Sequence, residues 1–193
     1  MKKFITLCFL VVLGVGPAAF ASLTTHIWYF DDELDLTPDP DVSIIDPQSG
    51  IQPASLWITP GPGGGWVNGA WELSGEMDIF LDNDPALNDY KRIIIELTWT
   101  PGALDSDLPN QPLVGVSAVP MDKMTMEVSG DPAGGLTIYE IVIWPNPPEE
   151  WIAIKGNIVV DELKITTECI PEPATMGLLG LGGLALLRYR RKR

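Results

Sequence analysis

The chain has 193 residues, with 26 acidic and 12 basic side chains and a formal net charge of −14 at neutral pH. Its length fits one domain of ordinary size once processing segments at the two ends are set apart. Residues 22–170 hold 25 of the acids and five bases, hence a net charge of −20, which argues against nucleic acid and anionic membrane surfaces as partners.

The first 21 residues have the three regions of a secretory signal peptide. Lysines at positions 2–3 precede an apolar stretch at residues 4–15, which is short for a lasting membrane anchor, the alternative interpretation. Ala19 and Ala21 then stand three residues and one residue before a predicted cut between Ala21 and Ser22. We therefore expect residues 1–21 to be removed during export.

The body, residues 22–168, alternates short apolar segments with dense turn signals. In chain order the predicted strands lie in THIWYF, ASLWITP, WVNGAWEL, EMDIFLD, YKRIIIELTWTPG, PLVGVSAVP, KMTMEVSG, GGLTIYEIVIWP and EEWIAIKGNIVVDELKITTE. The clearest is the fifth, in which every second residue from Ile93 to Trp99 is apolar. The last divides at residues 155–157, and in its second half Val159, Leu163 and Ile165 are expected to share one face.

These eight or nine short strands predict an all-β fold, an antiparallel β-sandwich of jelly-roll-like form. A closed β-barrel is the alternative. The body shows no sustained 3.6-residue apolar period and no internal repeat, which argues against a helical body or a solenoid.

The search for catalytic chemistry favours a protein that is not an enzyme. His26 is the single histidine, so a histidine-cluster zinc site is excluded and a Ser-His-Asp apparatus is disfavoured. We expect His26 to be solvated or to lie on a strand face. The glycine-rich GPGGGW at residues 61–66 lacks the lysine of a phosphate-binding loop and predicts a flexible turn.

An acidic segment, DIFLDNDPALND, offers hard oxygen ligands for a calcium ion. Its candidate metal ligands are Asp78, Asp82, Asp84 and Asp89. The spacing is not that of an EF-hand, and the alternative is a solvated acidic turn. Calcium is the one cofactor for which the sequence offers candidate ligands.

Seven tryptophans are many for this length. Aromatic rings stack on sugar faces, but they also fill sandwich cores. Trp144 and Trp151 flank the loop PNPPEE and are the first choice for an exposed glycan-stacking platform.

The last segment, residues 169–193, combines a motif, a short apolar run and a basic end. The motif is Pro171-Glu172-Pro173, the apolar run covers residues 174–187, and five of the last six residues are arginine or lysine. As a helix the run is roughly 21 Å long, whereas a bilayer core needs about 30 Å. The run is thus marginal as a permanent span and adequate as a transient stop during export.

This combination resembles the PEP-CTERM sorting signal of Gram-negative bacteria. The resemblance implies recognition by exosortase, a membrane cysteine transpeptidase or protease, while the chain is transiently held in the inner membrane. It also implies cleavage near the motif and delivery to the cell surface or an extracellular polysaccharide matrix. Pro171, Glu172 and Pro173 are recognition residues in this interpretation, and an uncleaved single-span anchor is the alternative.

Three functions follow from these observations. The first is a structural or adhesive protein of the extracellular polysaccharide matrix. The second is a calcium-supported carbohydrate-binding module, and the third is a hydrolase with paired carboxylates. Cys169 is the one cysteine left after signal removal, and the sequence places it in a tether beside the motif. Its alternatives are an intermolecular disulfide partner, a reactive thiol or a residue without a role.

Overall fold

The computed structural model describes residues 22–30, 36–45, 51–67, 70–83 and 90–170, which form strands and turns and no helix. The predicted signal peptide and the sorting tail from residue 171 onward lie outside these residues. The strands are β1 (Ser22–Tyr29), β2 (Val42–Ile44), β3 (Ser55–Thr59), β4 (Gly65–Val67), β5 (Ala70–Glu72), β6 (Gly75–Asp82), β7 (Tyr90–Pro101), β8 (Leu113–Ala118), β9 (Lys123–Gly130), β10 (Gly135–Trp144), β11 (Glu149–Gly156) and β12 (Ile158–Ile170).

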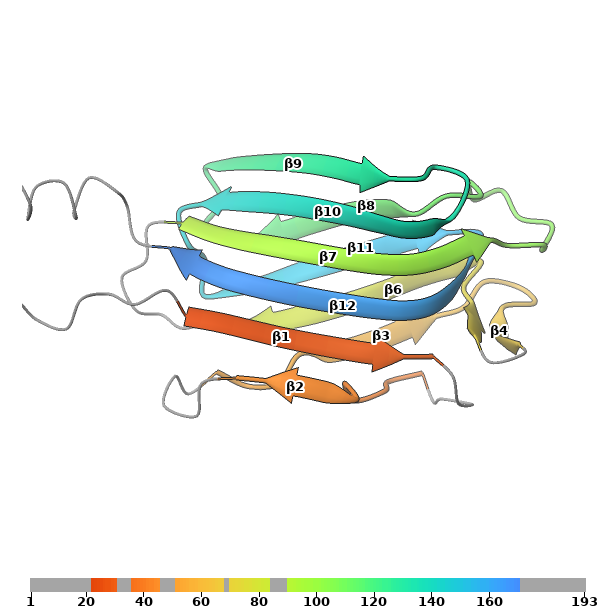
Figure 1. Ribbon diagram of the computed structural model, residues 1–193, viewed down its shortest axis with the longest axis horizontal. Coiled ribbons are helices and arrows are strands. Elements are labelled where there is room, and N and C mark those ends of the chain that lie inside the picture. The colour runs from red at the N-terminus through yellow and green to blue at the C-terminus, as the bar shows by residue number, and fades with distance from the viewer. Residues whose placement is uncertain (1–21, 31–35, 46–50, 68–69, 84–89, 171–193) are drawn as a thin grey trace, which may run out of the picture.

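The strands form two antiparallel sheets that lie one above the other as two layers (Figure 1). Sheet A has the order β2-β1-β12-β7-β10-β9, and the short strands β4 and β5 join it beside β12. Sheet B has the order β3-β6-β11-β8. The all-β, antiparallel prediction is confirmed for these residues. The count exceeds the expected eight or nine because the three-residue strand β2 was not predicted and the predicted segment WVNGAWEL is divided between two short strands, β4 and β5.

The first and last strands of the body pair with each other. Ser22 lies opposite Cys169, and the ladder continues to Tyr29 opposite Glu162. Because these partners are far apart in sequence, the pairing closes the whole body into one unit. It also places the beginning of β1 and the end of β12 side by side at one end of the sandwich (Figure 1). The predicted boundary at residue 168 falls inside β12, so Cys169 and Ile170 belong to the sandwich.

The core lies between the two sheets. Ile93, Ile95 and Leu97 of β7 are fully buried, as their alternation predicts, and belong to the same apolar cluster as Ile79 and Ile152 of sheet B. Burying each such side chain contributes about 1.5–3 kcal/mol relative to exposure. The period-two pattern therefore orients both sheets toward each other.

A β-bulge in β12 changes one predicted face. The register against β7 shifts between Val160 and Glu162, so one extra residue stands in β12 at Asp161. Val160 and Leu163 are both buried, whereas Val159 is only partly buried. The expectation that Val159 shares a face with Leu163 is wrong, because the extra residue reverses the alternation across the bulge.

The glycine-rich segment at residues 61–66 forms a turn that leads into β4, in agreement with the sequence. The segment packs closely against the start of β6. A Cβ atom on Gly75 would lie 2.1 Å from the carbonyl oxygen of Thr59 and 2.6 Å from the amide nitrogen of Gly61. Residue 75 must therefore be glycine for the turn and β6 to approach this closely.

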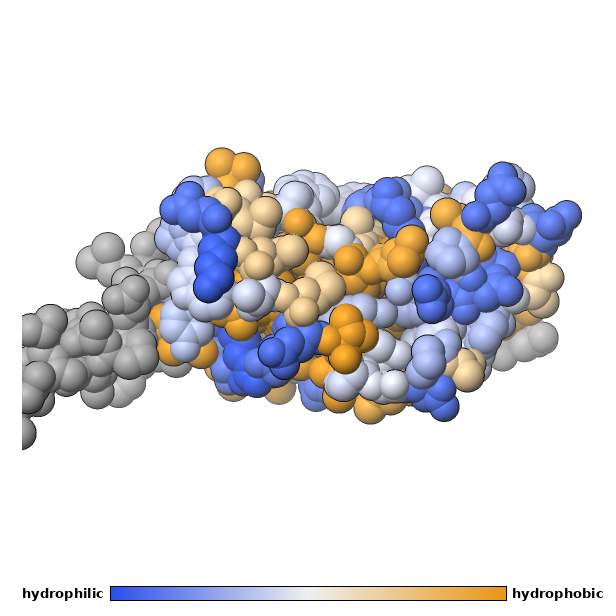
Figure 2. Space-filling view, turned by 90° about the horizontal axis from the view of Figure 1, so that it is seen from above, coloured by the Kyte–Doolittle hydropathy of each residue, from blue (hydrophilic) through white to orange (hydrophobic). Residues whose placement is uncertain are grey.

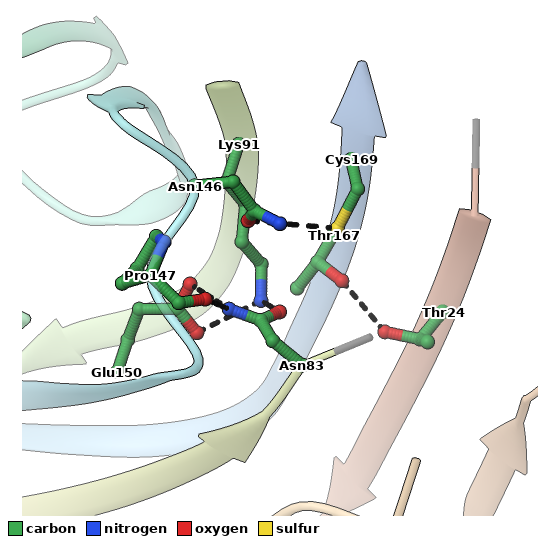
Figure 3. A network of polar contacts seen from close by, with 8 residues as sticks. All are labelled: Thr24, Asn83, Lys91, Asn146, Pro147, Glu150, Thr167 and Cys169. Carbon is green, nitrogen blue, oxygen red and sulfur yellow. Dashed lines mark hydrogen bonds and ion pairs between the residues drawn. The ribbon is translucent and has the colours of Figure 1, made fainter. Parts of the chain in front are cut away.

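One end of the core is polar (Figure 3). Lys91 and Glu150 are fully buried there, with Lys91 Nζ 2.8 Å from Glu150 Oε2, and Asn83 is 5% exposed. The hydroxyls of Thr24 and Thr167 hydrogen bond at 2.7 Å beside them. These groups lie at the end where β1 begins and β12 finishes.

His26 faces this core and is 2% exposed. Its Nδ1 lies 3.0 Å from Ser43 Oγ. Burial, followed by the positive charge of Lys91, lowers the pKa of His26 to about 4. Of the two expectations for His26, a place on a strand face holds and solvation does not, because the alternation of β1 turns Thr24, His26 and Trp28 inward.

We predict that Gly75→Ala lowers the free energy of unfolding by about 1–3 kcal/mol, because its methyl group would displace backbone atoms that have no free space. The measurement is urea unfolding of the purified body, residues 22–170. Gly115→Ala in β8 is the matched control, since nothing lies within 4 Å of its added Cβ. Equal stability of the two variants would contradict the close packing at Gly75.

We also predict that the body loses stability as the pH falls from about 6.5 to 4, and that His26 accounts for about 3 kcal/mol of this loss. The unfolded chain protonates His26 near pH 6.5, whereas the folded chain does so only near pH 4. The contribution is therefore complete above the unfolded pKa and disappears as the pH reaches the folded pKa. Urea unfolding across this range should show a weaker pH dependence for His26→Gln than for the wild type. Identical dependence in both proteins would contradict the assignment.

Candidate functional site

The outer face of sheet B gathers three aromatic side chains. Strands β3, β6 and β11 are neighbours in this sheet, and their inward residues, such as Leu56 and Ile152, are buried. Alternation along each strand turns Trp57, Phe80 and Trp151 to the outside. We call these three residues the aromatic face of sheet B.

The rings of the aromatic face contact one another. Trp57 and Trp151 stack with centroids 5.3 Å apart and planes at 25°. Phe80 lies 5.2 Å from Trp151 at a tilt of 58°. Trp57 is 38% and Trp151 is 43% exposed, so each ring rests partly on its neighbours and keeps a large surface in solvent. Such rings are held in place before any ligand arrives.

Charged groups lie beside the aromatic face on the same sheet. Trp57 stands opposite Asp78 in the ladder between β3 and β6. Lys155 Nζ forms an ion pair with Glu76 Oε1 at 2.8 Å. Partial burial, followed by the neighbouring Glu76, raises the pKa of Asp78 above its usual range. The face thus combines apolar rings with hydrogen-bond donors and acceptors.

Trp144, the other predicted platform residue, lies on the opposite side of the sandwich. It points outward from β10 in sheet A, where its ring is 5.7 Å from that of Tyr90. Lys123 Nζ lies 4.8 Å from the centre of the Trp144 ring. The predicted pair of Trp144 and Trp151 is therefore not brought together, because the loop between β10 and β11 carries the chain from sheet A to sheet B.

The C-terminal motif begins directly after β12 ends at Ile170. The family model described as the PEP-CTERM protein-sorting motif matches residues 170–192. The chain carries a PEP-CTERM sorting signal. Comparisons with curated proteins and with solved structures found no match. The PEP-CTERM signal implies an exosortase as processing partner, with export and sorting to the cell envelope.

The sequence suggested that Cys169 lies in a tether, but the structure places it in a strand. It belongs to β12, is 2% exposed, and its thiol donates to Asn146 Oδ1 at 3.8 Å. The PEP-CTERM motif therefore starts two residues beyond a buried position of the sandwich. Within the described ranges, no helix is both long and apolar enough to cross a bilayer.

The predicted calcium ligands are not assembled in the part of the chain that the structure describes. Asp78 and Asp82 both point outward from β6, but four residues of strand separate them by about 13 Å. Asp82 Oδ2 instead accepts a hydrogen bond from the backbone N–H of Gln52 at 3.0 Å. Asp84 and Asp89 lie outside the described residues. Among the residues described, no three His, Cys, Asp or Glu side chains are grouped to hold a metal ion.

A cleft of about 330 Å³ opens between the edge strands β8 and β9. Figure 2, which views this side of the molecule, shows apolar side chains gathered along its middle. The lining includes Trp99, Met126 and Val128, and its ionisable residues are Asp131 and Tyr139. Glycoside hydrolysis uses two carboxyl groups, and the described lining of this cleft provides one.

Sequence reasoning missed Trp57 and Phe80 as partners of Trp151. The signal was present in the alternation of both strands. Leu56 and Ile58 predict an inward face for β3, which turns Trp57 outward, and Ile79 and Leu81 do the same for Phe80. The alternation does not reveal that β3, β6 and β11 are adjacent strands of one sheet. That adjacency brings the three rings into contact.

Proposed function

We propose that the body is a non-catalytic, structural or adhesive protein of the extracellular polysaccharide matrix, which binds polysaccharide through the aromatic face of sheet B. The observation that carries this proposal is the exposed stack of Trp57 on Trp151, with Phe80 against it. Large aromatic surfaces facing water are unfavourable unless a ligand or partner covers them.

The geometry suits a polymer chain. Adjacent strands lie about 4.8 Å apart, so β3, β6 and β11 present a surface roughly 10 Å wide between the outer backbones. The apolar C–H faces of successive sugar rings stack on Trp57 and Trp151. Hydroxyl groups at the ring edges pair with Glu76, Asp78 and Lys155 beside the stack.

The net charge of the body favours neutral polysaccharides over acidic ones. Residues 22–170 carry a net charge of −20, which repels an acidic polymer at moderate ionic strength. We therefore propose a neutral polysaccharide as the ligand. The PEP-CTERM signal supports this setting, since it implies that the body reaches the cell envelope.

A calcium-supported carbohydrate-binding module remains the second candidate. Asp78 points outward beside the aromatic face, where partial burial, followed by the negative charge of Glu76, raises the pKa of its carboxyl group. A bound cation would relieve that repulsion. The two candidates differ in whether a chelator abolishes binding.

The aromatic face is tested by affinity electrophoresis of the purified body, residues 22–170, in gels containing a neutral glucan or alginate. We predict retardation by the neutral polymer, and about tenfold weaker binding for Trp57→Ala and Trp151→Ala, because each removes one stacking surface. Trp66→Ala is the matched control, since Trp66 is 37% exposed on β4, away from sheet B. Unchanged binding by a double Trp57→Ala/Trp151→Ala variant would refute the proposal, and loss of binding with EDTA would favour the calcium-supported module.

The sorting signal is tested in the full-length chain carrying an epitope tag after Arg193, produced in cells that contain an exosortase. We predict that Glu172→Ala keeps the tag attached and the protein in the membrane fraction, because the recognition motif is lost. Glu149→Ala, an exposed change on β11, should be processed like the wild type. Immunoblots of membrane and medium fractions provide the measurement, and normal tag removal in Glu172→Ala would contradict the role of the motif.

A further inference from the structure

Three buried side chains at the polar end of the core form a connected cluster (Figure 3). Lys91 Nζ donates to Asn83 Oδ1 and lies 2.8 Å from Glu150 Oε2. Asn83 Nδ2 donates to Glu150 Oε1 at 2.6 Å and to the carbonyl oxygen of Pro147 at 2.5 Å. The Glu150 carboxyl group thus contacts both the lysine amine and the asparagine amide nitrogen.

The strands hold these groups in place from both sheets. Asn83 follows directly after β6, and Glu150 is the second residue of β11, its neighbour in sheet B. Lys91 is the second residue of β7 in sheet A. The backbone N–H of Asn83 donates to the carbonyl of Pro148 at 3.1 Å, which fixes the asparagine beside the start of β11. Lys91 therefore reaches across the sandwich to a preformed site.

A fully buried lysine beside a fully buried glutamate is costly as an ion pair, because both charges lose their hydration. Burial, the largest influence, raises the pKa of Glu150, although Lys91 and Asn83 act against it. The apolar surroundings thus favour a proton on the Glu150 carboxyl. Transfer of one proton from Lys91 Nζ to the Glu150 carboxylate, 2.8 Å away, would remove both charges and leave Nζ with the lone pair that a nucleophile needs.

We propose that Lys91 and Asn83 form an intramolecular isopeptide bond, with Glu150 as the catalytic residue. The Lys91 Nζ lone pair attacks Asn83 Cγ, and the Glu150 carboxyl donates its proton to the amide while it accepts a proton released from Nζ. The Nζ–Cγ bond forms, the Cγ–Nδ2 bond breaks, and Nδ2 leaves as ammonia. The reaction needs no oxidant, reductant or cofactor, and it returns Glu150 to its starting state.

The contacts of Glu150 are those that this reaction requires. One carboxyl oxygen lies at the attacking nitrogen and the other at the leaving nitrogen, within the range for proton transfer. Holding an amine beside an amide in a buried site replaces a slow bimolecular step with a favoured intramolecular one. The product also removes the ammonium charge of Lys91 from the core.

The bond would tie the end of β6 in sheet B to the start of β7 in sheet A. It would lie at the end of the sandwich where β12 leads into the PEP-CTERM signal. Residues 22–170 contain one cysteine, so this exported body has no internal disulfide available. An isopeptide bond would supply a covalent link that reducing agents do not open.

The test uses the full-length chain, produced in bacterial cells and purified in detergent. We expect an intact mass about 17 Da below the value for the unmodified chain, the mass of the ammonia released. Digestion with a protease that cleaves after Asp and Glu, except before proline, should give a branched peptide in which residues 83–89 are attached through Lys91 to residues 90–96. An unmodified mass with a linear 90–96 peptide overturns the proposal, whether or not any variant folds.

Three variants separate the isopeptide bond from ammonia loss by a different route. Glu150→Gln keeps the side-chain volume but removes the proton carrier, so its mass should stay unmodified. Glu149→Gln, which changes the exposed carboxyl group next to Glu150 on β11, should keep the branched peptide. Ammonia loss through a cyclic imide at Asn83 would persist in Lys91→Arg, whereas the isopeptide bond would not form there. Loss of 17 Da in Lys91→Arg, or a branched peptide in Glu150→Gln, refutes the assignment.

Discussion

Packing of the inner face of sheet A against the inner face of sheet B is the contact on which the rest of the molecule depends. Alternating residues of β7 and β12 face those of β6 and β11, and their side chains form one apolar cluster. Because a strand has two faces, burying one face exposes the other. The same constraint that builds the core therefore orients Trp57, Phe80 and Trp151 toward solvent.

The core is not uniformly apolar, and its polar end has a chemical consequence. Lys91, Asn83 and Glu150 lie where β1 begins and β12 ends, buried with a histidine whose pKa is strongly lowered. Buried polar groups are retained in proteins when they are fully paired or when they have a function. In this cluster the pairing and the reactive arrangement coincide, since one carboxyl group contacts both nitrogen atoms.

The two ends of the body and the outer face of sheet B both bear on the proposed role in a polysaccharide matrix. The pairing of β1 with β12 brings the start and the end of the body to one end of the sandwich, and the PEP-CTERM signal follows in the chain from that end. In the proposed role, the large negative charge of the body favours its solubility, and the aromatic face offers one surface for contact with an uncharged polysaccharide.

The sequence by itself determined the antiparallel β class, the inward face of most strands and the C-terminal sorting signal, because each depends on residues close together in the chain. It did not locate the bulge in β12, since one inserted residue reverses an alternation without altering composition. Tertiary structure alone decided which outward residues meet. Trp144 lies apart from Trp151 because β10 and β11 belong to different sheets. The ring that stacks on Trp151 is that of Trp57, which lies on β3, on the other side of β6. The Lys91, Asn83 and Glu150 cluster was also outside local reasoning, because Glu150 is more than fifty residues from both partners and only sheet packing brings them together.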